Sequence, residues 1–169
     1  MNRPVRSLLE GKPVLVVINT HHASFARLPS LIAAARQRDI PVVFANGSAT
    51  ETAIPDGLRK NEYLIRQRRH SVFYGTELPI LLREFGASTV ILAGGETSVG
   101  VHYSFVDAHQ YDYFCRVVED CMAGTSPLAH EAALRAMEYM QTGARRKSDE
   151  VIATFGNAPA SLAATGDNL

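Results

Sequence analysis

Residues 89–101, TVILAGGETSVGV, decide the fold of this chain. The first five residues are β-branched or apolar, a run that is long enough for a strand buried on both faces and too short for a helix. Gly94 and Gly95 end this strand, and Thr97 or Ser98 is then suited to cap a helix. A strand end, a glycine turn and a helix N-terminus meet at one point, which is where ligands normally bind in an open α/β sheet. We predict that the functional site lies here.

Strand-like and helix-like segments alternate along the rest of the chain. Short apolar runs predict strands, and apolar residues three and four positions apart predict amphipathic helices. Because parallel strands need helical crossovers, the predicted fold class is α/β, Rossmann-like and three-layered: a doubly wound, mainly parallel sheet of about six strands with helices on both faces. The predicted strands are 14–18, 40–45, 62–66, 89–93, 113–118 and 151–155, and the predicted helices are about 28–39, 76–86, one that starts at 97 or 98, and 126–140.

The length predicts a single domain, residues 1–169. The last segment, 157–169, has no clear period, and two interpretations stay open for it: a mobile tail, or a segment that docks on a neighbour.

Composition narrows the possible partners. Lys+Arg and Asp+Glu both total 17, so the formal net charge is zero and no long-range field recruits nucleic acid or an anionic membrane. We therefore expect a small-molecule ligand or other copies of the chain as partners. Cys115 and Cys121 lack metal-ligand spacing, so we expect reduced thiols, no metal and no cofactor. No run has the length of a signal-peptide core or a membrane span, and we expect a cytoplasmic protein.

Two stretches resemble the isochorismatase-like hydrolase superfamily, which includes cysteine hydrolases such as nicotinamidases and carbamoylsarcosine amidases. Residues 71–78, SVFYGTEL, resemble the motif S-A-F-x-G-T-x-L of that family. Residues 90–101, the pair Asp107-Ala108 and residues 117–120, VVED, resemble its next strand, helix start and following strand. The likeness covers most of residues 13–155 and implies the same fold.

The resemblance implies a catalytic triad of aspartate, lysine and cysteine. Carried over by position, the aspartate falls on Asn19, the lysine on Gln67 and the cysteine on Gly100, so all three are substituted. A shift of one residue would instead put Arg66 or Arg68 at the lysine position.

These substitutions have chemical consequences. Gly100 has no side chain and cannot form an acyl-enzyme. Asn19 can orient a ligand but cannot transfer a proton at neutral pH, and Gln67 removes a cation. The two cysteines map to the next strand and its exit. The sequence therefore argues against a cysteine amidase, and we see no match to the metal site of the nicotinamidase branch.

Glu96 and His21 are the candidates for acid/base chemistry. Glu96 follows Gly95 at a peptide bond that the resemblance implies to be cis, next to an oxyanion hole. It could transfer protons or hold a cationic or hydroxylated ligand, or it could simply be a carboxylate favoured by the helix N-terminus. His21 follows the first strand and could act near pH 7, or could be a hydrogen-bonded loop histidine.

Further residues around the same turns are candidates for ligand binding. Arginine forks match carboxylate and phosphate groups, but a charged run is also typical of a solvated edge. Thr97 and Ser98 are expected first as helix caps and second as ligand contacts. The basic run is Arg66, Arg68, Arg69 and His70, and the predicted ligand-binding residues are Gly95, Thr97, Ser98, Arg68 and Phe25.

Two functions from different classes fit these residues. One is a diverged hydrolase that acts without a covalent intermediate on a small carboxylated or amide-bearing molecule, with Glu96 or His21 as acid/base and Asn19 orienting the ligand. The other is a catalytically inactive relative that binds a metabolite or serves as an assembly subunit. A third, nucleotide or RNA binding through the arginine run, is disfavoured by the zero net charge. The resemblance also implies a homo-oligomer, a dimer or higher.

Overall fold

The structure is a computed structural model, which describes residues 11–19, 25–47 and 57–156. All six strands pair in parallel in the order β3-β2-β1-β4-β5-β6. The predicted parallel six-stranded sheet is therefore confirmed. The strands are β1 Lys12–Ile18, β2 Val42–Asn46, β3 Glu62–Arg66, β4 Ala87–Gly95, β5 Phe114–Ala123 and β6 Arg145–Arg146. The helices are α1 Leu28–Gln37, α2 Leu78–Glu84, the π-helical turn η1 Thr97–Val101, α3 His102–Gln110, α4 Pro127–Met140 and α5 Ser148–Phe155.

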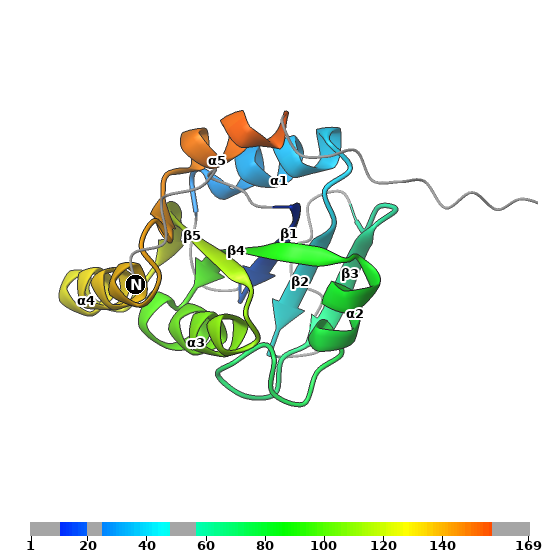
Figure 1. Ribbon diagram of the computed structural model, residues 1–169. Helices are drawn as coiled ribbons and strands as arrows, with labels where there is room; N and C mark the ends of the chain where they lie inside the picture. Colours follow the sequence, from blue (N-terminus) through cyan, green and yellow to red (C-terminus); the bar gives the residue numbers. More distant parts are fainter. Residues whose placement is uncertain (1–10, 20–24, 48–56, 157–169) are drawn as a thin grey trace, which may run out of the picture.

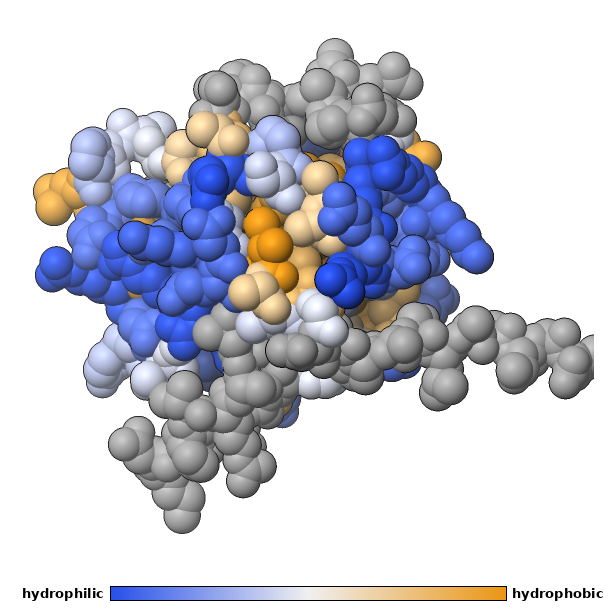
Figure 2. Space-filling view, turned by 90° about the horizontal axis from the view of Figure 1, so that it is seen from above, coloured by the Kyte–Doolittle hydropathy of each residue, from blue (hydrophilic) through white to orange (hydrophobic). Residues whose placement is uncertain are grey.

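Helices cover both faces of the sheet (Figure 1). One core lies under α2, α3 and α4, where the fully buried Phe105 is among the largest side chains. The other core lies under α1 and α5. Seen from the side of α1 and α5, hydrophobic residues form a central strip between hydrophilic ones (Figure 2). This three-layer arrangement brings the carboxyl ends of the parallel strands to one edge of the sheet, which is where a ligand site belongs.

The local signals predicted most elements well. Ser126 caps α4, since its hydroxyl accepts a hydrogen bond from the backbone N–H of Ala129 at 3.1 Å, and Pro127 occupies the first helical position. In contrast, α2 begins at Leu78 with Glu77 as its cap residue, one residue later than the prediction of Thr76 as the cap. The Thr76 hydroxyl accepts a hydrogen bond from the Leu78 N–H but also donates to the Val72 carbonyl, so Thr76 belongs to the preceding turn.

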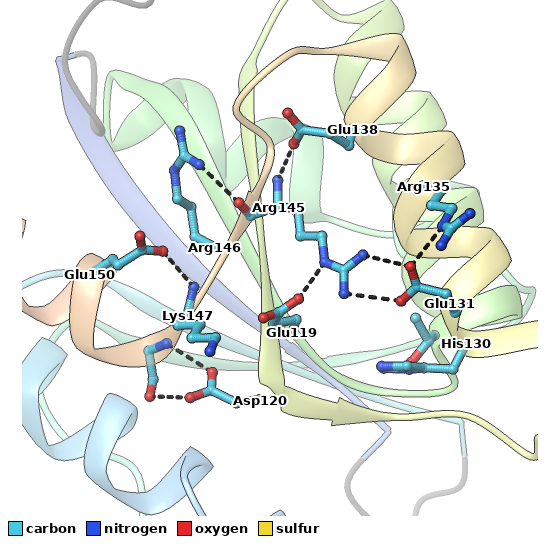
Figure 3. Close-up of polar contacts among 12 residues, drawn as sticks. Glu119, Asp120, His130, Glu131, Arg135, Glu138, Arg145, Arg146, Lys147 and Glu150 are labelled. Atoms are coloured by element: carbon cyan, nitrogen blue, oxygen red, sulfur yellow. Dashed lines mark hydrogen bonds and ion pairs between the residues drawn. The ribbon is translucent and has the colours of Figure 1, made fainter. Parts of the chain in front are cut away.

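The predicted last strand, residues 151–155, is wrong. Val151 and Phe155 are buried four positions apart on one side of α5, which is helical spacing. The strand at this edge is instead β6, which begins at Arg145. Its guanidinium bonds both carboxylate oxygens of Glu131 on α4, at 3.1 and 3.0 Å, and also pairs with Glu119 on β5 (Figure 3). Ion pairs rather than an apolar run hold this two-residue strand.

Gly94 determines how closely the ends of β1 and β4 approach. Its φ of +106° lies in the left-handed region, and a Cβ at this position would stand 2.0 Å from the carbonyl oxygen of Ile18. Only glycine fits there. The consequence is that the residue after β1 and the residues after β4 lie side by side.

Two remaining expectations concern the ends of the chain and the membrane. Residues 157–169 lie outside the described residues. None of the helices that the structure describes has the length and apolar character needed to span a membrane.

Candidate functional site

A cavity of about 720 Å³ opens at the carboxyl ends of β1 to β4. This is the position expected for a ligand site in an open parallel sheet, and its volume is in the range of small-molecule sites. Its lining combines the exits of four neighbouring strands with the start of η1. The lining residues are Asn19, Gly47, Arg66, Gln67, Arg68, Arg69, His70, Glu96, Val99 and Gly100.

Asn19 sits at the end of β1 with a left-handed φ of +39°, a conformation that asparagine tolerates better than most residues. Its side-chain oxygen accepts a hydrogen bond from the Gly47 N–H at 3.2 Å. This contact directs the amide nitrogen the other way, and a Cβ at Gly100 would lie 3.7 Å from it. Asn19 and Gly100 are therefore neighbours, and Asn19 offers N–H donors rather than an acceptor beside Gly100.

Gln67 is buried and its amide orientation is determined by two backbone carbonyls. The side-chain nitrogen donates to Arg69 O at 2.9 Å and to His70 O at 2.8 Å. The side-chain oxygen is buried and has no hydrogen-bond partner among the described residues. Gln67 thus holds the basic run in place and leaves one buried acceptor unsatisfied, which is uncommon in native proteins.

Glu96 follows a cis peptide bond with Gly95, as the resemblance implies. Its Oε1 accepts hydrogen bonds from the Thr125 hydroxyl at 2.8 Å, the Thr125 N–H at 3.3 Å and the Ser98 hydroxyl at 3.4 Å. No described residue donates to Oε2. The carboxylate is therefore anchored through one oxygen and can meet a ligand through the other.

Four exposed basic or imidazole side chains line the opposite side of the cavity. Arg66 and Arg68 form no ion pair with an acidic residue of the described segments, while Arg69 donates to the Arg68 carbonyl at 3.1 Å. The His70 ring packs against Tyr103 with 5.5 Å between ring centroids. Glu96 is the one acidic residue among the described lining residues, so positive charge predominates in the cavity.

Four other predicted ligand-binding residues lie outside the cavity lining. Thr97 is buried and its hydroxyl lies 2.8 Å from Nδ1 of His130 on α4. The residue before the helical turn is Glu96, and neither Thr97 nor Ser98 caps a backbone N–H, so the predicted cap is wrong. Phe25 belongs to the core under α1, and its ring edge would lie 3.4 Å from a Cβ at Gly95. None of Gly95, Thr97, Ser98 and Phe25 is among the residues that line the cavity.

Both cysteines are fully buried on β5 and neither lines the cavity. Burial raises the pKa of the Cys115 thiol to about 12. Burial, together with the nearby Asp120 carboxylate, raises the pKa of Cys121 to about 12 as well. Because the thiolate is the nucleophilic form, neither cysteine is a reactive sulfur at neutral pH.

Three further points concern His21, metal binding and the residues that support the site. His21 lies outside the described residues. Among the residues that are described, no group of three or more His, Cys, Asp or Glu side chains could hold a metal ion. Thr125 and His130 support the site but give no sequence signal, because 29 and 33 residues separate them from Glu96 and Thr97.

Comparison with known proteins gives a family match over most of the chain. The model of the isochorismatase domain matches residues 18–146. An uncharacterized isochorismatase family protein of Bacillus subtilis, YwoC, is 31% identical over 96 residues, which cover 57% of this chain and 50% of that protein. Maleamate amidohydrolase of Pseudomonas putida is 37% identical over 73 residues, or 43% of this chain and 34% of that protein. The chain spans half or less of the length of the curated relatives it matches.

Solved structures share the fold. An isochorismatase-like hydrolase from Alkaliphilus metalliredigens superposes with a TM-score of 0.75 at 24% identity, covering 86% of this chain and 98% of that one. A nicotinamidase from Staphylococcus aureus gives a TM-score of 0.68 at 19% identity, covering 82% and 98%. At these identities, the likeness establishes the architecture alone.

Proposed function

This chain belongs to the isochorismatase-domain family, and on that premise we propose that it is a hydrolase that acts on a small carboxylated or amide-bearing molecule without a covalent enzyme intermediate. The observation that carries the proposal is the composition of the cavity. Gly100, Asn19 and Glu96 line the same space, and no thiol is among its described lining residues.

The substituted triad positions are part of this proposal. We assign the aspartate, lysine and cysteine positions of the cysteine hydrolases to Asn19, Gln67 and Gly100. A hydrolase with this set has no sulfur with which to form an acyl-enzyme, so water itself must attack the substrate.

Glu96 is the proposed proton carrier for that attack. For an amide substrate, water oxygen bonds to the carbonyl carbon while Oε2 of Glu96 takes one water proton. The carbon–nitrogen bond then breaks, and the same carboxyl group returns the proton to the leaving nitrogen, which gives a carboxylic acid and an amine. Asn19 orients the substrate by donating from its side-chain nitrogen to the carbonyl oxygen.

The names of two relatives support a hydrolytic reaction. The Pseudomonas putida protein is an amidohydrolase and the Staphylococcus aureus protein is a nicotinamidase. The basic side chains that line the cavity add a preference for an anionic group, because arginine binds carboxylates in a forked geometry.

A second function is favoured by a different observation. The amides of Asn19 and Gln67 are both tied to backbone groups and cannot transfer protons. This arrangement suits a catalytically inactive family member that binds a metabolite or serves as an assembly subunit. We also propose that the chain is cytoplasmic and forms a homo-oligomer. Sedimentation equilibrium would test the oligomeric state.

The test is a hydrolysis screen of small amides that carry a carboxylate, followed by NMR of the products. For any substrate found, Glu96→Gln is expected to lower kcat about 100-fold or more, in line with removal of a general acid/base. The matched control is Glu77→Gln, which changes an exposed glutamate outside the cavity lining and is expected to leave kcat unchanged. His21→Ala tests the second candidate for acid/base chemistry, His21. Full activity of Glu96→Gln would refute its role, and binding without turnover across the screen would favour the inactive relative.

A further inference from the structure

The cavity carries opposite charges at its two ends. Arg66 ends β3 and Arg68 follows it, whereas Glu96 follows β4. In the sheet order, β2 and β1 lie between these strands. Neighbouring strands are about 4.8 Å apart, so the backbones at the two ends are separated by about 14 Å. The side chains of Arg66, Arg68 and Glu96 all line the cavity between these ends, so the space suits a ligand with a backbone of a few atoms.

Neither end is neutralised by the described residues of the protein. Some other arginines of this chain do have acidic partners among the described residues: Arg36 pairs with Glu62. Arg145 pairs with Glu119 and Glu131 (Figure 3). Arg66 and Arg68 have none within the described ranges.

The acidic end of the cavity also has a charged atom without a partner among the described residues. Oε1 of Glu96 receives the three donors that Thr125 and Ser98 supply. Oε2 receives none from the described residues. Fixed charges that meet no partner among the described residues are what a site complementary to an oppositely charged ligand requires.

We propose that this cavity binds a bipolar small molecule, with a carboxylate held by Arg66 and Arg68 and an N–H donor held by Oε2 of Glu96. The inference rests on the proposed function, because it describes the ligand of the same site. It also gives the reaction a direction, since the nitrogen of the ligand lies against the group that would protonate it.

The two ends make different chemical demands on the ligand. Arginine forks favour a planar carboxylate, which they can bond through two parallel N–H groups. A single carboxylate oxygen anchored from behind favours an ammonium or amide N–H and repels a second carboxylate. A molecule with carboxylates at both ends is therefore disfavoured, although it is the better match for the arginines alone.

Equilibrium binding separates these cases. Isothermal titration of the full chain uses 4-aminobutyrate, succinate and 1,4-diaminobutane, which have similar lengths and differ in their end groups. We expect 4-aminobutyrate to bind about tenfold or more tightly than either of the others, the size of one charge-assisted hydrogen bond. Glu96→Gln should remove its advantage over succinate, and the double variant Arg66→Gln/Arg68→Gln should weaken both carboxylates about tenfold or more.

The control variant is Arg135→Gln, because Arg135 is exposed on α4 and lies outside the cavity lining. It should bind all three probes as the unaltered chain does, and circular dichroism is used to check that every variant is folded. Equal or tighter binding of succinate, an unchanged ratio in Glu96→Gln, or no binding of any probe would overturn the inference. None of these three probes has a bond to hydrolyse, so their binding is measured independently of turnover. If the screen of small amides finds no hydrolysis, that result refutes the proposed function and leaves the inference about binding standing.

Discussion

A thiol installed at position 100 should become the one reactive sulfur of the folded chain. A Cβ at Gly100 would lie 3.2 Å from both Gly95 O and Ile18 Cγ2, so Gly100→Cys requires these neighbours to shift slightly. Overpacking of this kind costs about 1–3 kcal/mol, or a decrease in Tm of about 2–12 °C for a chain of this size. The variant should therefore fold.

The reactivity follows from the pKa values. A cavity thiol with an ordinary pKa near 8.5 is about half thiolate at pH 8.5. With pKa values of about 12, only about 1 in 3,000 molecules of Cys115 or Cys121 is thiolate at that pH, before burial excludes the reagent. The native thiols should therefore react more than about 1,000-fold slower than the new one.

The assay is titration with Ellman's reagent, with and without denaturant. The unaltered chain should release no equivalent while native and two when unfolded, because it has two cysteines, both buried. Gly100→Cys should add one rapid equivalent in the native state. Rapid labelling of the unaltered chain, or an inert new thiol in a folded variant, would refute the placement of Gly100 at the cavity and of the cysteines away from it.

Three further predictions concern stability. Glu62→Gln should destabilise the chain by about 1.5–3 kcal/mol in urea unfolding, because the buried Arg36 guanidinium loses its carboxylate partner and keeps its hydrogen bond to the Gly57 carbonyl; a loss below about 1 kcal/mol would contradict this reasoning. The difference in stability between the unaltered chain and Glu62→Gln should become smaller as the pH is lowered. Burial raises the pKa of Glu62, but hydrogen bonds from Arg36 and the Arg59 N–H outweigh burial and hold this pKa below its usual range. The stabilisation is therefore complete above the unfolded pKa of about 4.3 and is lost as pH falls through the lower folded value, whereas a constant difference down to pH 2 would refute it. Gly94→Ala should not yield a native chain by circular dichroism, because its Cβ meets the Ile18 carbonyl at 2.0 Å, and a native-like melting curve would show that β1 and β4 are packed differently.

Much of the fold can be predicted from the sequence because local patterns and tertiary packing agree. The aliphatic strand before Asn19 and the proline-opened helix after Ser126 are examples. Residues 151–155 mislead because a five-residue stretch with four apolar residues does not distinguish a strand from one side of a short helix. The true edge strand at Arg145 has no apolar run at all, since its stabilisation comes from carboxylates on β5 and α4.

The candidate site is only partly predictable, and for a similar reason. Motif spacing places Asn19, Gln67, Glu96 and Gly100, and all four line one cavity. The anchoring of Glu96 by Thr125 depends on a contact between distant segments, for which a single sequence has no local pattern.

The most direct test of the central claim is the turnover of a hydrolysed substrate by the double variant Cys115→Ala/Cys121→Ala. Hydrolysis by water in a cavity without sulfur predicts a kcat/KM within about twofold of the unaltered chain, once the folded fraction has been determined. A loss of about 100-fold or more in the folded variant would place a nucleophilic sulfur in the reaction and contradict the account.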